Sequence, residues 1–426
     1  MNAVLIMFME SRENITITDL NTLHYTAAII LAGAVTPPTK TEQTIRDPNR
    51  NIKIKIEKVR KWIGKLTAVV NGKKLTPKVK KFIAKETIES VIHTQKMILA
   101  MLAKRLRAKT EATKRFNNNR LYRQKKKAFY TKINSEGANK DVIADPPTKE
   151  DISEFWGGLW SSKGGHNSNA QWLKDEKKEM ENKPKAVWSD FNLETLTSTT
   201  KKISNWKAPG IDQVQNFWIK HLVALHPALV KVANLTLSQP ESAPPWLTNG
   251  KTTLLHKDRD TSDAKNYRPI TCLPTYYKLI TLMLTDKVYQ HVTENSILPP
   301  EQKGIMRGAR GCKDHLALDK VITEDAKRKN RNLSVMWIDY KKAYDSVPHE
   351  WIIEMLKLYK IDDTIIKWIS AMIPQWKTMI YLPTAEGCIL TDILFFERGI
   401  FQGDSLSPLL FCLALIPITC ESWIHH

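Results

Sequence analysis

The chain has 426 residues, of which 42% are apolar, so it has enough material for two or three packed domains and is not a disordered chain. Its 65 Lys and Arg against 44 Asp and Glu give a formal net charge of +21, which predicts polyanionic partners. No apolar run reaches the roughly 20 residues that a membrane-spanning helix requires, so we expect no membrane segment. The five cysteines form no C-x-x-C pair, which favours a reducing, intracellular compartment without distinguishing nucleus from cytoplasm.

Residues 1–50 alternate apolar and polar patches and end in a proline-rich stretch, which is typical of an N-terminal tail or linker. Residues 51–140 are the basic part of the chain. Between residues 50 and 133 there are 26 Lys and Arg against four acidic residues, which matches the charge surplus of the whole protein. From Pro77 to Glu136 apolar residues recur at three- and four-residue steps without Gly or further Pro, which predicts one or two long amphipathic helices.

The polar face of these helices is expected to contact nucleic-acid phosphates, because cations are dense and acids rare. The plainer alternative is a solvated basic face without a partner. The residues expected to bind nucleic acid are Lys104, Arg105, Arg107, Lys109, Lys114, Arg115, Arg120, Arg123, Lys125, Lys126 and Lys127. Phe116, Tyr122, Phe129 and Tyr130 are candidates for stacking on bases, although their spacing favours packing between the helices.

Residues 141–186 are glycine-containing and are expected to form a linker with one short helix near 152–160. Another helix is predicted over 191–203. From residue 252 onward strand-like runs alternate with helical ones, which predicts an α+β fold. The predicted strands lie at 252–256, 333–338, 378–382 and 387–396, and the predicted helices at 276–294, 315–329, 349–358, 364–373 and 406–416.

Five ordered motifs carry a resemblance to a known family. They are 205–212 (Asn-Trp-Lys-Ala-Pro-Gly-Ile-Asp), 266–274 (Asn-Tyr-Arg-Pro-Ile-Thr-Cys-Leu-Pro), 301–308 (Glu-Gln-Lys-Gly-Ile-Met-Arg-Gly), 335–347 around Asp339, and 398–411 around Gln402. In this order they resemble the reverse transcriptases of non-LTR (LINE-type) retrotransposons. The resemblance implies that residues 187–426 form the fingers and a partial palm of a right-hand polymerase, preceded by the basic, mainly helical region. It also implies an RNA template, a DNA primer, deoxynucleoside triphosphates and Mg²⁺.

The resemblance assigns a catalytic, metal-binding role to Asp339, which the apolar run before it would deliver to the end of a strand. Two-metal phosphoryl transfer needs carboxylates that hold both ions. Tyr344 matches the aromatic position that excludes a 2′-hydroxyl. Gln402 and Gly403 match the motif beside the incoming nucleotide and template base, where glycine allows a close backbone approach.

Arg268, Arg307 and Lys303 resemble fingers residues near the triphosphate, because guanidinium and ammonium groups suit phosphate oxygens. A surface ion pair explains any single one of them equally well. Asp345 follows the family pattern too, and we expect it to accept structural hydrogen bonds rather than to bind metal.

The sequence departs from the family because it contains no Tyr-X-Asp-Asp motif. The pair Asp362-Asp363 precedes a predicted helix and is expected to cap it. We therefore expect a truncated reverse transcriptase that is catalytically incomplete as given. The alternatives are a non-enzymatic RNA- or DNA-binding protein and a decayed structural fragment.

Overall fold

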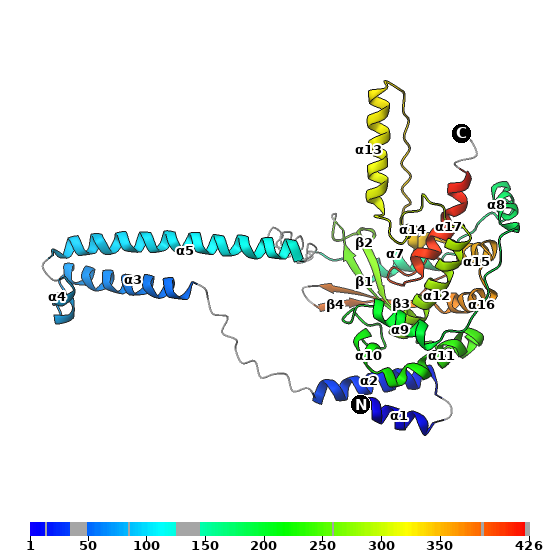
Figure 1. The fold of residues 1–426 in the computed structure, drawn as a ribbon, viewed down its shortest axis with the longest axis horizontal. Helices are drawn as coiled ribbons and strands as arrows, with labels where there is room; N and C mark the ends of the chain where they lie inside the picture. The colour runs from blue at the N-terminus through cyan, green and yellow to red at the C-terminus, as the bar shows by residue number, and fades with distance from the viewer. Residues whose placement is uncertain are drawn as a thin grey trace. The chain divides into compact units, whose positions relative to one another are not determined.

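The computed structural model describes residues 1–12, 15–34, 49–83, 86–124, 145–257, 260–384 and 387–421 (Figure 1). The chain divides into two compact units, one of residues 1–35 with 142–426 and one of residues 36–141. In the described part of the chain, the larger unit holds all strands and the smaller unit is helical. None of the described helices is long and apolar enough to cross a membrane.

The larger unit is built on one mixed sheet with the strand order β2-β1-β3-β4, and β5 also pairs with β3. The strands are β1 (Asn249–His256), β2 (Tyr267–Cys272), β3 (Lys377–Thr384), β4 (Gly387–Leu390) and β5 (Leu394–Phe395). β1 pairs antiparallel with β2 and parallel with β3, so Lys251 lies opposite both Cys272 and Met379. The predicted strand over 387–396 is thus divided into β4 and β5.

Three buried threonine hydroxyls connect the neighbouring strands β2, β1 and β3 in a chain of hydrogen bonds. Thr252 Oγ1 lies 2.7 Å from Thr271 Oγ1 on β2 and 2.8 Å from Thr378 Oγ1 on β3. Thr378 Oγ1 donates to the carbonyl of Gly250 at 2.9 Å. Because each hydroxyl has one proton, this bond fixes the direction of the chain, with Thr252 donating to Thr378 and accepting from Thr271. These hydroxyl hydrogen bonds hold β2, and with it the motif 266–274, against the centre of the sheet.

Helices surround the sheet, and most lie where the apolar periodicity predicts them (Figure 1). They are α7 (Lys149–Ser161), α8 (Gln171–Glu181), α9 (Leu193–Lys202), α10 (Asn216–His221), α11 (His226–Ser238), α12 (Thr275–Glu294), α13 (Cys312–Arg328), α14 (Ala343–Ser346), α15 (His349–Leu358), α16 (Asp363–Met372) and α17 (Ser407–Glu421). Short 3₁₀ turns lie at Val223–Leu225, Pro240–Ser242, Ala264–Asn266 and Ile373–Gln375. The prediction that Asp362 caps a helix is confirmed, because its side chain accepts from the Thr364 amide at 2.7 Å.

In the linker predicted over 141–186, the short helix expected near 152–160 is confirmed as α7, whereas a second helix, α8, was not predicted. α7 begins with a capping box in which Thr148 and Asp151 accept each other's backbone N–H groups. Its apolar residues Ile152, Trp156 and Trp160 follow at four-residue steps, and all three are fully buried. α8 also buries apolar residues, Leu173 and Met180, in the core of the larger unit, so much of the predicted linker is packed structure.

The prediction of a tail over 1–50 is also wrong for most of the residues that the structure describes there. α1 (Asn2–Glu10) and α2 (Ile17–Ala34) are helices, and Leu20 and Ala27 are buried in the core of the larger unit. His24 on α2 is fully buried, and its Nδ1 atom is hydrogen-bonded to the Tyr276 hydroxyl of α12 at 2.6 Å. The proline-rich end of the predicted tail lies outside the described residues.

The strand predicted over 333–338 is wrong in this structure. Residues 331–340 have no regular secondary structure, and Met336 and Trp337 are exposed by 81% and 75%. A strand is stable only when a neighbouring strand takes up its backbone hydrogen bonds. None of the five described strands pairs with this segment. The preceding helix α13, although predicted correctly, has no buried residue.

The smaller unit consists of α3 (Arg50–Val70), α4 (Pro77–Ile83) and α5 (Ile88–Gln124). Leu66, Val79, Ile83 and Val91 form its buried core. The rings of Trp62 and Phe82 stack beside this core with 3.8 Å between centroids. α3 ends at a turn with Gly72 at φ 92°, and α4 begins at Pro77. The glycine and the proline therefore set the ends of these two helices.

Replacing Thr252 by Val should destabilise the larger unit by about 1–3 kcal/mol, because the buried Thr271 hydroxyl would lose its acceptor and Thr378, which keeps its bond to Gly250, would lose a donor. Thr252→Ser keeps the hydroxyl and serves as the matched control. Denaturant unfolding followed by far-UV circular dichroism measures both variants. A Val variant as stable as the wild type, with the Ser variant also unchanged, would contradict the role given to the hydroxyl chain.

Candidate nucleotide-binding site

Residues 398–403 lie between β2 and the turn around α14 and are hydrogen-bonded to both. The Thr271 amide donates to the Gln402 carbonyl at 2.8 Å, and the Ile400 amide donates to the Tyr344 carbonyl at 2.9 Å. A single antiparallel bridge between Pro348 and Arg398 continues this pairing. The motif around Gln402 and the motif around Asp339 are thereby brought together against the motif of β2.

Gly403 is required at its position by both conformation and space. Its φ of 140° is one that side-chain-bearing residues rarely adopt, and a Cβ atom there would overlap the carbonyl oxygen of Thr271. The close approach is therefore to the backbone of β2. The residue is itself exposed, so the backbone at Gly403 is open to solvent on its other side.

Asp345 lies buried under this segment, at 2% exposure. Its carboxylate accepts from Trp160 Nε1 at 3.1 Å and from Gln402 Nε2 at 3.3 Å. Burial raises the pKa of Asp345, and the hydrogen bond from Trp160 partly offsets that effect. These contacts confirm the expectation that Asp345 is a structural acceptor, and they orient the Gln402 side chain.

Tyr344 is half-buried and stacks on Phe411 of α17, with 4.9 Å between ring centroids and 23° between planes. Burial raises the pKa of its hydroxyl. Tyr344 precedes Asp345, which accepts a hydrogen bond from Gln402, so the Tyr344 side chain lies in the same part of the fold as Gln402. The structure brings together three of the residues that the sequence predicts for the nucleotide site: Tyr344, Gln402 and Gly403.

Lys342 is a site residue that the sequence analysis missed. Its Nζ atom donates to the carbonyls of Lys265 and Tyr267 at 3.0 and 3.2 Å, and lies 4.1 Å from the centre of the Trp156 ring. Desolvation lowers its pKa to about 8, and the nearby Lys257 acts in the same direction. The residue joins the Asp339 motif to β2. Its position between two predicted site residues was the available signal.

A cavity of about 250 Å³ opens beside Gly403. Three of the five sequence motifs line it: Lys207 and Ala208 from 205–212, Ile270 to Cys272 from β2, and Gly403 with Ser405. Thr275, Lys278 and Leu279 from the first turns of α12 complete this wall. Lys207 and Lys278 give the cavity two ammonium groups, which suits a phosphate-containing ligand.

Two buried carboxyl groups flank this cavity. Asp212 accepts from the Thr275 amide at 2.5 Å, and Asp404 accepts from the Thr281 hydroxyl at 2.6 Å. Burial raises the pKa of each to about 6, and the charge of Lys278 partly offsets both shifts. Burial in turn lowers the pKa of Lys278, against the opposing effect of Asp212. No local sequence pattern indicates this network, because its members lie far apart along the chain.

The predicted fingers cations are placed differently from one another. Arg268 is exposed on β2, and since alternate strand residues share a face, it lies on the side of Ile270 and Cys272, which line the cavity. Arg307 forms an ion pair with Asp286 of α12 and lies 4.3 Å from the centre of the Tyr289 ring.

Lys202 of α9 also pairs with Asp286, at 2.8 Å. Lys303 is half-buried, with its Nζ atom 3.8 Å from Met306 Sδ. The ion-pair alternative considered for these residues is therefore confirmed for Arg307.

Asp339 lies in the exposed, irregular segment 331–340 and is not brought to the edge of the sheet. Among the residues that the structure describes, no three His, Cys, Asp or Glu side chains are grouped so that they could hold a metal ion. The two-metal clamp that the resemblance implies therefore does not fit the described residues. We derive no catalytic step through Mg²⁺.

The predicted nucleic-acid-binding cations are placed on α5 of the smaller unit. Lys104, Arg105, Arg107, Lys109, Lys114, Arg115, Arg120 and Arg123 are all exposed, and Lys125, Lys126 and Lys127 lie outside the described residues. Phe116 is exposed by 66%, so the expectation that it packs between helices is wrong, because it points away from the core around Leu66. Phe129 and Tyr130 also lie outside the described residues.

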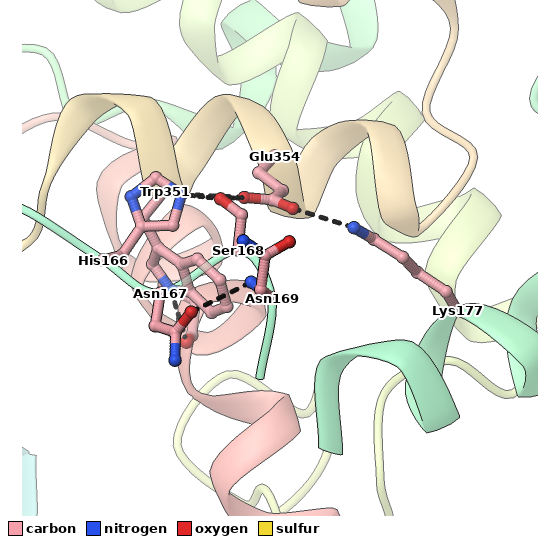
Figure 2. A network of polar contacts seen from close by, with 8 residues as sticks. His166, Asn167, Ser168, Asn169, Lys177, Trp351 and Glu354 are labelled. Atoms are coloured by element: carbon pink, nitrogen blue, oxygen red, sulfur yellow. Dashed lines mark hydrogen bonds and ion pairs between the residues drawn. The ribbon is translucent and has the colours of Figure 1, made fainter. Parts of the chain in front are cut away.

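A separate polar cluster joins α8 and the loop before it to α15 (Figure 2). Glu354 contacts His166 Nε2 at 2.7 Å, the Ser168 hydroxyl at 3.0 Å and Lys177 Nζ at 3.0 Å. Ser168 contacts the same ring nitrogen of His166 at 3.1 Å. A hydrolytic triad needs its serine and carboxylate on opposite nitrogens. This cluster is therefore a structural contact.

The part of the chain that carries these motifs is similar to known proteins. The family model described as reverse transcriptase (RNA-dependent DNA polymerase) matches residues 255–422. Residues 255–422 belong to the reverse transcriptase family. The reverse transcriptase segment thus includes β2, the cavity wall at Gly403 and the whole Asp339 motif, and the α+β class is confirmed for the larger unit.

Relatives of this reverse transcriptase segment come from retrotransposons. A polyprotein of the R2 element from Popillia japonica is 31% identical over 42% of the chain and 24% of its own length. The polymerase of the jockey element from Drosophila funebris is 23% identical over 52% of the chain and 24% of its own length. A 149 kDa protein of transposon TX1 from Xenopus laevis is 25% identical over 65% of the chain and 19% of its own length.

The resemblance to non-LTR retrotransposon reverse transcriptases is therefore confirmed. In each of these three alignments the chain spans no more than about a quarter of the relative's length. The match to the TX1 protein extends over more of the chain than the 168-residue family match, so the similarity is not confined to that segment.

Replacing Gly403 by Ala should cost about 1–3 kcal/mol of stability from backbone strain alone, with further loss from the overlap with Thr271. Gly165→Ala is the matched control, because a Cβ atom there meets nothing within 4 Å. Thermal and denaturant unfolding measure both variants, and limited proteolysis reports whether residues 398–403 are released. Equal stability of the two variants would show that the close approach at Gly403 is wrong.

The free energy of unfolding should carry a component that falls as pH rises from about 4 to about 6. The folded-state pKa values of Asp212 and Asp404 lie above the unfolded value, so the folded protein holds these two protons more tightly than the unfolded chain does. The stability that this protonation adds is fully present below about pH 4 and is lost as the pH rises through about 6. At about 1.4 kcal/mol per pKa unit, each contributes about 2–3 kcal/mol. Denaturant titrations at several pH values compare wild type with Asp404→Asn, which should lose about half of this component. Superimposable pH profiles would contradict the assignment.

Proposed function

We propose that this chain supplies the template- and nucleotide-binding part of a retrotransposon reverse transcriptase, with residues 187–426 as fingers and part of the palm. The observation that carries the proposal is the convergence of three motifs on the cavity beside Gly403. Its ligands would be an RNA template, a DNA primer and deoxynucleoside triphosphates. Two lysines at the cavity and an exposed glycine backbone at its rim suit a phosphate-bearing ligand with a planar base.

In this proposal Gln402 and Gly403 lie against the incoming nucleotide, and Tyr344 limits the space at its sugar. The contact between Asp345 and Gln402 supports this assignment because it orients the amide before a ligand arrives. Pre-orientation lowers the entropy lost on binding. Arg268, on the cavity side of β2, is the fingers cation that fits best with the triphosphate, whereas Arg307 would have to leave Asp286.

Asp339 remains the proposed metal-binding carboxylate of the reaction in this family. Its exposed, irregular segment would have to become a strand with a pairing partner before the carboxylate could hold an ion beside the cavity. The proposal for this chain therefore concerns binding of template, primer and nucleotide, and the chemistry is attributed to the related polymerases.

A second function is favoured by a separate observation, the exposed cations of α5 in the smaller unit. We propose that residues 51–140 bind nucleic acid through its phosphates, independently of sequence. If this activity existed without the nucleotide site, the chain would be a non-enzymatic RNA- or DNA-binding protein. The two functions are separated by asking whether a complementary nucleotide changes the complex.

The test measures the affinity of the chain for a template–primer duplex with each of the four deoxynucleoside triphosphates added. The complementary nucleotide should tighten the complex, and Gln402→Ala should weaken nucleotide binding about tenfold by removing a contact worth about 1.4 kcal/mol. Gln290→Ala, on the opposite part of α12 and outside the cavity, is the matched control.

If Gln402→Ala and the wild type respond alike while duplex binding persists, the nucleotide site is wrong and the binding-only function stands. A primer-extension assay with Mg²⁺ on a homopolymer template, with Asp339→Ala as its control, then reports directly whether the chain incorporates nucleotides.

A further inference from the structure

The smaller unit contains a lysine-rich cavity that none of the sequence motifs pointed to. It lies where α3 turns into α4 and has a volume of about 430 Å³. Half of its ten lining residues are Lys61, Lys65, Lys73, Lys74 and Lys78. Among the described residues that line it, none is acidic. The cavity is separate from the cations predicted on α5.

The lysines at this cavity are largely uncompensated. Lys61 pairs with Glu57 at 2.8 Å, but both side chains are mostly exposed. Lys65 lies 5.1 Å from the centre of the Trp62 ring. For Lys73, Lys74 and Lys78, the described part of the chain provides no ion pair. Ammonium groups gathered around one cavity repel one another, and an anion placed among them removes that repulsion.

The cavity has a fixed frame. α3 and α4 are held together by the stacked rings of Trp62 and Phe82 and by the buried cluster to which Leu66 and Val79 both belong. The turn between them is closed by backbone bonds from Gly72 to Val69 and from Lys73 to Ala68, at 3.1 and 3.0 Å. The lysines on both sides therefore start from a common, preformed wall, which reduces the entropy cost of binding.

Gly64 provides space on the α3 side of the cavity. Glycine in the interior of a helix costs stability relative to alanine. Packing does not require glycine here, since a Cβ atom at this position would meet nothing within 4 Å. The missing side chain leaves the cavity open along α3.

We infer that the α3–α4 cavity binds two or more adjacent phosphate groups of a nucleic-acid strand. The inference rests on the proposed binding of nucleic acid by residues 51–140 and names a site for it. Lysine ammonium groups act as point charges that accept phosphates in many geometries, which suits contact independent of sequence.

A nucleic-acid strand fits better than a single anionic headgroup because the same unit continues the cation surface along α5. This helix has 37 residues, and at 1.5 Å per residue it extends for about 55 Å. The described cations predicted to bind nucleic acid run from Lys104 to Arg123, about 30 Å of that length, which matches several consecutive phosphates of a strand. Phe116, exposed on α5 among the cations, adds a ring on which a base can stack.

The test measures binding of a labelled single-stranded RNA to the full chain by fluorescence anisotropy across a range of salt concentrations. The double variant Lys73→Gln/Lys74→Gln removes two cavity lysines. Lys80→Gln/Lys81→Gln removes two exposed lysines of α4 that do not line the cavity, so the change in net charge is the same. The cavity variant should lower the slope of log K against log salt by about 1.4, at about 0.7 per phosphate contact, and the control by less than half of that.

A second pair of variants fills the cavity without changing charge. Gly64→Leu should weaken RNA binding about tenfold, while Gly64→Ala should bind as the wild type does, with circular dichroism confirming the fold of both. Equal salt slopes for the two lysine variants, together with wild-type affinity of Gly64→Leu, would show that the cavity is not the phosphate site, while the proposed nucleic-acid binding by residues 51–140 would stand. A wild-type chain that binds no RNA would overturn the proposed binding itself. Loss of binding to phosphatidylserine vesicles, but not to RNA, in the cavity variant would also overturn the inference.

Discussion

The hydrogen bonds that hold residues 398–403 between β2 and α14 are the constraint on which the candidate site depends. One side of this segment is bonded to Thr271, whose hydroxyl is itself part of the buried threonine chain across the sheet. The other side is bonded to the turn that carries Tyr344 and Asp345. Only glycine at 403 allows the segment to approach β2 so closely. A change at any of these contacts would move the nucleotide motif, the Asp339 motif and the cavity wall together.

Local sequence patterns predicted most helices because capping and apolar spacing act within a few residues. The cap at Asp362 and the buried four-residue spacing in α7 are examples. The failures arose where structure depends on distant partners. Residues 333–338 have strand-forming composition, but none of the described strands pairs with them. Residues 2–10 and 17–34 have tail-like composition, yet they form helices that pack against the core of the larger unit.

The candidate site was predictable in its motif residues and not in its supporting groups. Tyr344, Gln402 and Gly403 follow from the resemblance, and the structure places them near one another. Lys342 and the buried carboxyls of Asp212 and Asp404 depend on burial, which no local pattern reports. The lysine cavity of α3 and α4 was hidden for the opposite reason: its residues were counted in the charge surplus, but only the turn at Gly72 gathers them.

The central claim is that the cavity beside Gly403 receives the nucleotide opposite the template. Photo-crosslinking tests it most directly, using a template–primer duplex, a complementary nucleotide with a photoreactive base, and peptide mapping by mass spectrometry. The account predicts crosslinks at residues 270–272 and 402–405, dependent on the complementary template base. Crosslinks confined to residues 50–124, or independent of the template base, would contradict it.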